Sequence, residues 1–241
     1  IDVITTLIEA QTPINQWPPE LFHVADQIRK ADLLLSKPIV KAAALKTMFA
    51  KGLAVSLAEI DLAGLRGRGG AGFKTAQKWK FCAQESSQQR YVVCNADEGE
   101  PGTFKDRVLL NRYADQVFEG MTICAAIIGA QQGFLYLRGE YLYLYDQLNQ
   151  VLQQRRDDGL LGDNILNQGL AFDIEIRLGA GAYICGEESA LIESLQGKPG
   201  IPRNRPPYPV SCGYLNQPTV VNNVETFLAA AAIIVNGGEW F

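Results

Sequence analysis

The chain has 241 residues, of which 47% are hydrophobic and 20% are charged, and its formal net charge is −4. This is the composition of a folded globular chain, and the acidic balance gives no overall attraction to nucleic acid or to an anionic membrane. The apolar runs, such as residues 229–235, fall far short of the roughly 20 residues that a membrane-spanning helix needs, so we expect no direct membrane insertion.

The predicted elements begin with a helical N-terminal lead-in over residues 1–50, broken at prolines such as Pro13 and Pro38. From residue 51 to residue 241 we expect a single main domain. A glycine-rich loop is followed by a helix that ends near Phe81 and by a strand over residues 90–97.

Further along the chain, helices are predicted at 115–128, 140–156 and about 186–196, and strands at 133–138 and 172–178. The proline-rich residues 197–218 are expected to be extended, and a last helix is expected near residues 222–235. Strands that alternate with helices of ten or more residues predict an α/β fold with a mainly parallel sheet flanked by helices.

The cysteines and the single histidine argue against a metal site and against a hydrolytic triad. The five cysteines are widely spaced and include no C-x-x-C pair, so we predict no metal or iron–sulfur ligation by this chain and a reducing, cytoplasmic compartment. His23 is interpreted as a surface helix residue, because a Ser-His-Asp or Cys-His mechanism would need a histidine close to the motifs described next.

The glycine-rich loop also carries unusual positive charge. Residues 67–72 fit the pattern G-x-G-x-x-G, and cations flank them at Arg66, Arg68, Lys74 and Lys78. Residues 56–65 before the loop are predicted to be helical, whereas the dinucleotide-binding fingerprint requires a strand there. The fold is therefore expected to be Rossmann-like with an atypical loop. Its free amides suit a phosphate or a flat ring, although a glycine-rich surface turn with solvated cations fits equally well.

Two further polar segments follow predicted strands, where ligands of parallel α/β sheets are bound. In CNADEGEPGTFKD, Asn95 and Asp97 could hydrogen-bond a heterocycle and hydroxyl groups, but turn chemistry or a hard-cation site would use the same residue types. In GAGAYICGEESA, Glu187 and Glu188 could equally be first-turn anions that interact with a helix dipole.

Four long strings occur in one order along the chain, namely GLRGRGGAGF, CNADEGEPGTFKDR, GAGAYICGEESALIES and PTVVNNVETF. In order and spacing they resemble the FMN- and NADH-binding subunit of respiratory complex I. They also resemble the diaphorase subunit of bacterial NAD-reducing hydrogenases and the flavin subunit of NAD-linked formate dehydrogenases. The resemblance covers about residues 51–241, and segments such as YLRGEYLYL are more similar to the hydrogenase diaphorase.

The resemblance implies that FMN lies at the carboxyl edge of the sheet and exchanges a hydride with NAD(H), without a catalytic side chain. The FMN-binding residues it implies are Gly67, Arg68, Gly69, Lys78, Asn95, Asp97, Tyr183, Gly186, Glu187, Asn222 and Asn223. The nucleotide-binding residues it implies are Phe73 and Phe81 around the adenine, Glu100 and Glu188 as positioning groups, and Arg205 and Tyr208. In the last two positions the family commonly has lysine and phenylalanine, which leaves the nucleotide affinity open.

The resemblance also implies partners. Relatives continue past the position of Phe241 into a β-rich domain and a helical domain that ligates a four-iron cluster, so we expect this chain to be part of a longer subunit. The implied partners are iron–sulfur subunits of a hydrogenase, a formate dehydrogenase or a complex I assembly, in the cytoplasm or attached there to a membrane complex. A second hypothesis is a non-catalytic assembly module that keeps the fold without flavin.

Overall fold

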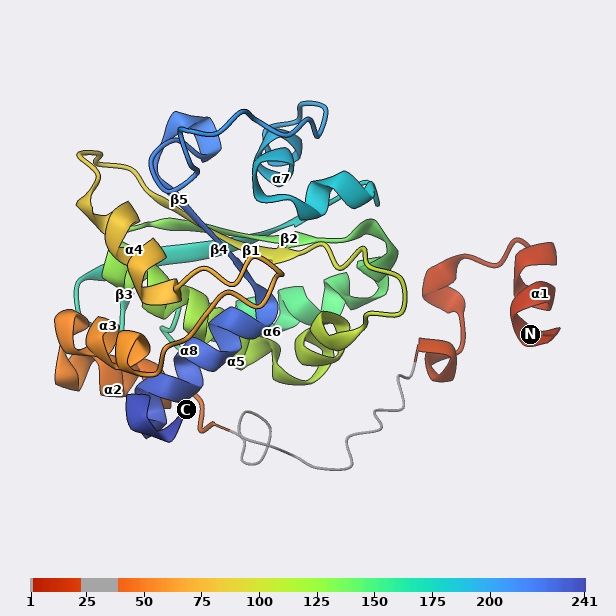
Figure 1. Ribbon diagram of the computed structural model, residues 1–241. Helices are drawn as coiled ribbons and strands as arrows, with labels where there is room; N and C mark the ends of the chain where they lie inside the picture. Colours follow the sequence, from red (N-terminus) through yellow and green to blue (C-terminus); the bar gives the residue numbers. More distant parts are fainter. Residues whose placement is uncertain (1, 23–38) are drawn as a thin grey trace.

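The computed structural model describes residues 2–22 and 39–241, so the predictions for His23 and Pro38 lie outside the described residues. Its centre is a five-stranded sheet with the strand order β3-β4-β2-β1-β5 (Figure 1). All neighbouring strands are parallel except β3, which runs antiparallel to β4 at one edge. The strands are β1 (Tyr91–Ala96), β2 (Gln132–Leu137), β3 (Gly162–Ile165), β4 (Leu170–Leu178) and β5 (Thr219–Asn223). The predicted α/β fold with a mainly parallel sheet is confirmed.

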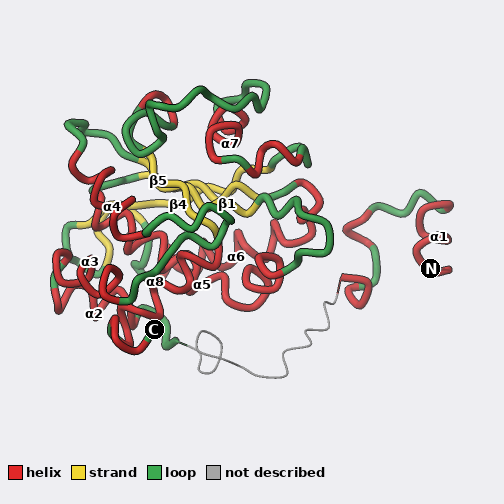
Figure 2. Tube along the Cα trace, viewed as in Figure 1, coloured by secondary structure: helices red, strands yellow, loops and turns green. Residues whose placement is uncertain are grey.

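The two faces of the sheet are covered by different helices because successive side chains of a strand point to opposite faces. In β1, Val92 and Cys94 belong to the larger core, whereas Tyr91 and Val93 belong to a smaller cluster on the other face. The smaller cluster is closed by α7 (Glu188–Leu195) and by Tyr214. Figure 2 shows most of the helices on one side of the sheet and mainly loops with α7 on the other.

The larger core gathers apolar residues from six helices, which are α2 (Ala43–Lys51), α3 (Leu53–Leu62), α4 (Thr75–Gln84), α5 (Lys105–Ile128), α6 (Tyr145–Asp157) and α8 (Val224–Asn236). Helices α5 and α8 lie side by side in this core and approach each other closely. A Cβ on Gly120 of α5 would lie 2.0 Å from the carbonyl oxygen of Phe227 in α8, so only glycine fits at this crossing.

Helix α2 is attached to the same core although it lies within the predicted lead-in. Leu45 and Met48 are fully buried, and α2 has no side chain of its own that caps its first turn. Instead, the buried carboxylate of Glu119 in α5 accepts hydrogen bonds from the backbone amides of Ala42 and Leu45, over 3.2 and 2.9 Å. Glu119 therefore supplies from another helix the acceptors that a local N-cap residue usually supplies.

The segment before residue 23 is short and mostly exposed. It contains α1 (Asp2–Glu9) and two 3-10 turns (Ile14–Gln16 and Pro19–Phe22). Figure 1 shows α1 apart from the sheet and its helices, while Phe22 stacks on Tyr143 with the ring centroids 5.1 Å apart. The described part of the predicted lead-in is thus helical, with proline-bounded breaks.

The structure differs from the predicted elements in four places. Helix α5 begins ten residues before the predicted start at residue 115, and β3 and β5 were not predicted as strands. The predicted helix over 140–156 is a 3-10 segment (Gly139–Leu144) followed by α6. The helix predicted before the glycine-rich loop is present as α3, so that loop does not follow a strand.

Candidate functional site

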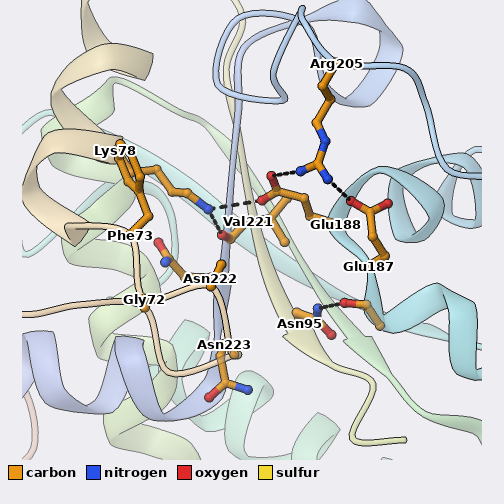
Figure 3. A pocket seen from close by; sticks show the side chains of 14 residues that line it. Gly72, Phe73, Lys78, Asn95, Glu187, Glu188, Arg205, Val221, Asn222 and Asn223 are labelled. Carbon is orange, nitrogen blue, oxygen red and sulfur yellow. Dashed lines mark hydrogen bonds and ion pairs between the residues drawn. The ribbon is translucent and has the colours of Figure 1, made fainter.

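A cavity of about 300 Å³ lies at the carboxyl ends of β1 and β5, where the glycine-rich loop meets the starts of α7 and α8 (Figure 3). The predicted FMN-binding residues that line it are Gly67, Gly69, Lys78, Asn95, Gly186, Glu187, Asn222 and Asn223. The predicted nucleotide-binding residues that line it are Phe73, Glu188 and Arg205. The fold therefore gathers residues from five separate stretches of the sequence around one space.

The glycine-rich loop between α3 and α4 is closed by hydrogen bonds within itself. Gly67 N donates to Phe73 O over 2.9 Å, and the Arg66 guanidinium donates to Gly72 O over 3.0 Å. Gly72 has a φ of +63°, which favours glycine. A Cβ on Gly69 would lie 3.4 Å from the Cβ of Asn223, so the absence of a side chain lets the loop lie close to the end of β5.

Helix α4 directs two side chains toward β5. The ammonium of Lys78 donates to Val221 O over 2.9 Å and lies 3.1 Å from Glu188 Oε2 (Figure 3). One residue further along, the fully buried Trp79 donates from Nε1 to Asn222 Oδ1 over 2.8 Å. Trp79 thus fixes the Asn222 side chain while Lys78 holds a positive charge at the wall of the cavity.

The opposite wall is formed by the start of α7. Glu187 caps this helix, because its Oε2 accepts the backbone amides of Ser189 and Ala190, each over 3.0 Å. Arg205 lies 3.4 Å from Oε1 of Glu187 and 3.4 Å from Oε1 of Glu188, so one guanidinium bridges both carboxylates (Figure 3). Residues of opposite charge are therefore already paired across the cavity.

The floor lies at the end of β1. Asn95 donates from Nδ2 to Gly186 O over 2.9 Å, and its Oδ1 accepts the backbone amide of Asp97 over 3.0 Å. Asp97 Oδ2 is buried and has no hydrogen-bond partner in the described part of the chain. Asp97 itself does not line the cavity, but a Cβ on Gly186, which does line it, would lie 3.8 Å from this oxygen. An unpaired buried acceptor of this kind indicates a place for a donor group of a ligand.

Burial raises the pKa of Asp97 from an ordinary value of 3.8 to about 6, although the guanidinium of Arg138 acts in the opposite direction and Glu140 adds to the rise. Above about pH 6 the folded, ligand-free protein therefore holds a carboxylate that would be better solvated in the unfolded chain. This cost decreases as the pH falls through 6, and it disappears below the pKa of the unfolded chain, where both states are protonated.

Asp97→Asn is accordingly expected to stabilise the ligand-free protein at pH 8 by about 1 kcal/mol, discounted for the partial exposure of Asp97, or about 2–4 °C in the thermal midpoint. Near pH 4 the difference from the wild type should vanish. Thermal unfolding of both proteins at the two pH values checks this expectation. An equal gain at both would show that the ionisation of Asp97 is not its cause.

The remaining predicted residues lie near the cavity without lining it. The Tyr183 hydroxyl donates to Glu100 Oε1 over 2.5 Å, and both side chains are exposed. The backbone amide of Arg68 donates to Thr226 Oγ1 over 3.0 Å.

The aromatic side chains lie at the rim. The rings of Phe73 and Phe81 are 6.4 Å apart at an angle of 46°, and both are exposed. A flat ring could enter between them only if they separated and became parallel. Tyr208 is also exposed, and the Arg205 guanidinium lies 6.0 Å from its ring centroid.

Three charged residues next to the cavity were given no role by the sequence reasoning. Lys105 and Asp106 in the first turn of α5 both bond the side chain of Asn223, and Glu225 in the first turn of α8 lies 3.3 Å from the Lys105 ammonium. Lys105 and Asp106 belong to the string CNADEGEPGTFKDR, and Glu225 belongs to PTVVNNVETF. Their position as charged residues inside two of the four family-like strings was the sequence signal that could have identified them.

Within residues 2–22 and 39–241, no group of three or more His, Cys, Asp or Glu side chains is arranged so that it could hold a metal ion. None of the helices in these two ranges is long and apolar enough to cross a membrane.

Comparison with known proteins identifies relatives of the whole cavity region. The model of the Nuo51 FMN-binding domain family matches residues 60–232. The NAD-reducing hydrogenase HoxS subunit alpha of Cupriavidus necator is 61% identical over 178 residues, which are 73% of this chain and 30% of that protein. An NADH-quinone oxidoreductase subunit of Aquifex aeolicus is 52% identical over 180 residues, which are 75% of this chain and 42% of that protein.

Among solved structures, an NAD+-reducing NiFe-hydrogenase in the H2-reduced state matches with a TM-score of 0.86 and 51% sequence identity. That match covers all of this chain and 41% of the other chain. The chain thus spans less than half the length of each of these proteins.

Proposed function

Since the chain belongs to the Nuo51 FMN-binding domain family, we propose that it holds FMN in the cavity at the carboxyl ends of β1 and β5 and exchanges a hydride with NAD(H) there. The observation that carries this proposal is the convergence of a lysine ammonium, a glycine-rich loop and the side-chain amides of Asn95, Asn222 and Asn223 on one space. A flavin mononucleotide needs a cation for its phosphate, close backbone for its flat ring and polar groups for the ring edge and hydroxyls.

The phosphate is assigned to Lys78. Its side chain is only 18% exposed, so its charge is less screened than that of a surface lysine. Within the chain the ammonium is paired with Glu188, and a phosphate would compete with this carboxylate for it. Gly67 and Gly69, which line the same wall, let the ligand approach the main chain of the loop.

The hydroxyls of the ribityl chain are assigned to Asp97. Its unpaired Oδ2 can accept a hydrogen bond from a hydroxyl group, and it lies next to Gly186, which lines the cavity. Glu187 has a second carboxylate oxygen besides the one that caps α7. Tyr183 lies beside Gly99 in the loop after β1, and a Cβ on Gly99 would be 3.1 Å from the Tyr183 ring. We assign both to the same ligand, together with Arg68.

When bound, FMN would supply the redox chemistry, which is hydride exchange with NAD(H) and one-electron transfer to a further acceptor. The chain supplies position. We propose that NAD(H) lies along the rim beside Phe73 and Phe81, with Glu188, Glu100 and the Arg205–Tyr208 pair around its polar groups. Glu100 and Glu188 then position the nucleotide, and no side chain of this chain needs to act as acid or base.

We further propose that the chain works as the diaphorase part of an NAD-reducing hydrogenase, with iron–sulfur subunits as its partners and in the cytoplasm. The identity of 61% to the HoxS subunit and the TM-score of 0.86 to the NAD+-reducing hydrogenase support this choice over complex I or a formate dehydrogenase. A four-iron cluster would belong to the rest of the subunit. We also propose that the FMN-binding domain begins before residue 51, since α2 shares its core.

The test is reconstitution of the purified chain with FMN, followed by removal of unbound flavin. We expect a yellow protein with about one flavin per chain that reduces a soluble dye with NADH. Riboflavin, which lacks the phosphate, should bind at least about tenfold more weakly if Lys78 holds that phosphate. A folded chain that retains no flavin at any FMN concentration would overturn the proposed function.

A further inference from the structure

The side chain of Asn223 is held by two charged residues that do not line the cavity. The Lys105 ammonium donates to Asn223 Oδ1 over 2.8 Å, and Asn223 Nδ2 donates to Asp106 Oδ2 over 2.6 Å. Both residues lie in the first turn of α5, and Asn223 is the last residue of β5. A residue of the cavity wall is therefore fixed by a helix that starts outside it.

These charges determine which way round the Asn223 carboxamide lies. Its Oδ1 also accepts the backbone amide of Glu225 over 3.0 Å, so both lone pairs of the oxygen face donors while Nδ2 faces a carboxylate. Exchanging the oxygen and the nitrogen would bring the NH2 group against an ammonium and the oxygen against Asp106. The carboxamide keeps one uncommitted polar group, its second N–H, so Asn223 can only donate to a ligand.

The Lys105 ammonium also connects the segments that surround the cavity. It lies 2.6 Å from Asp106 Oδ1 and 3.3 Å from Glu225 Oε2. Glu225 Oε1 in turn lies 3.8 Å from Arg68 Nε in the glycine-rich loop. Without Lys105, the carboxylates of Asp106 and Glu225 would lie beside Asn223 with no cation between them.

The exposure of these groups determines what the loss of Lys105 costs. The Lys105 side chain is 40% exposed, so its charge is partly screened. Asp106 is 3% exposed, and Lys105 is the cation that opposes the effect of burial on it, so the loss of Lys105 leaves a buried carboxylate without this partner. The loss of Lys105 should therefore lower the stability of the domain as well as release the orientation of Asn223.

We propose that Lys105 is a positioning residue for the cofactor, which orients Asn223 as a hydrogen-bond donor to FMN and keeps Asp106 and Glu225 in place beside it. The inference rests on the proposed function, since it assigns a role at the same cavity. Lys105 acts through Asn223 and does not itself need to touch the flavin.

The test is a set of FMN titrations on the full chain, in which quenching of the flavin fluorescence reports binding. The thermal unfolding of each ligand-free protein is measured alongside. Lys105→Met should raise the FMN dissociation constant about tenfold, and the thermal midpoint should fall by a few °C because Asp106 stays buried without its cation. Lys105→Arg, which keeps the charge, should recover most of the affinity. Lys46→Met, at an exposed lysine of α2 remote from the cavity, is the matched control and should match the wild type.

A double-mutant cycle decides whether Lys105 acts through Asn223. The double variant Lys105→Met with Asn223→Ala should bind FMN about as weakly as Asn223→Ala alone. Losses that multiply would overturn the inference, and so would a Lys105→Met variant that binds FMN like Lys46→Met. A wild-type chain that binds no FMN would instead overturn the proposed function. The two failures are distinguishable, because the proposed function is tested by the wild type alone and the inference by the variants.

Discussion

Lys78→Met is expected to weaken FMN binding about a hundredfold, because a hydrogen bond from a partly buried ammonium to a phosphate is among the stronger polar interactions. Two effects act in the same direction. The variant loses the cation at the cavity wall. It also leaves the Glu188 carboxylate, which lies 3.1 Å from that ammonium in the wild type, without this partner, so its negative charge repels the phosphate more strongly. A titration of the ligand-free chain with FMN measures the loss.

Riboflavin separates the phosphate from the rest of the ligand. Lys78→Met should change the riboflavin affinity by less than about threefold, since this ligand carries no charge for the ammonium to meet. Lys78→Arg keeps the charge and should bind FMN more tightly than the Met variant, although the planar guanidinium differs in shape from an ammonium. If both ligands lost affinity equally, Lys78 would support the cavity wall through Val221 and would not bind the phosphate.

The residues that the structure brings to the cavity are easiest to recognise in the sequence where local composition indicates a ligand site. A loop dense in glycines and cations, and polar segments directly after strands, are visible without any knowledge of contacts. The structure brings Gly67, Lys78, Asn95 and Glu187 to one cavity. It also confirms that a helix and not a strand precedes the glycine-rich loop.

The end of the chain was predicted less well because β5 has no turn after it. Thr219–Asn223 passes directly into α8, and Asn223 is both the last strand residue and the cap of the helix, with its side chain accepting the amide of Glu225. A five-residue strand without a following turn signal reads as the beginning of the apolar helix. The roles proposed for Asn222 and Asn223 therefore rest on the resemblance and not on periodicity.

The charges behind Asn223 could not be predicted because their contacts are distant in sequence. Lys105 and Asn223 are 118 positions apart, and in the sequence Lys105 and Asp106 lie in the segment after a predicted strand, before the predicted start of the helix. The start of α5 was also placed too late. Tyr113 has non-helical dihedrals (φ −129°), so the helical pattern is interrupted there, and the regular part begins after it.

The ion pairs across the cavity have a consequence for binding that no motif shows. Lys78 is paired with Glu188, and Arg205 with Glu187 and Glu188, so the charges that we assign to the ligands already offset one another in the ligand-free chain. A bound phosphate must displace one of these pairings. The net gain from Lys78 is then a difference between two charged contacts, which is why the expected loss is hundredfold and not larger.

The second large effect is expected at the helix crossing beneath the cavity. Gly120→Ala should destabilise the protein by about 3 kcal/mol or more, because the new Cβ would lie 2.0 Å from Phe227 O and 2.6 Å from Phe227 C, and backbone atoms of a packed helix cannot turn aside as a side chain can. Helix propensity alone predicts the opposite sign, a gain of up to about 1 kcal/mol. Urea unfolding of the ligand-free chain distinguishes the two.

A control on the same helix isolates the steric term. Ala126→Gly, also in α5, should cost about 1 kcal/mol from propensity, with a small further loss from the buried methyl group.

Because α8 begins at Val224, directly after Asn223, a displaced α8 should also carry Asn222 and Asn223 away from the cavity. Gly120→Ala protein that remains folded is therefore expected to bind FMN more weakly, whereas Ala126→Gly should keep its affinity. A stabilised Gly120→Ala variant with unchanged FMN binding would show that α5 and α8 have room to separate, and the close crossing would not be what positions the end of β5.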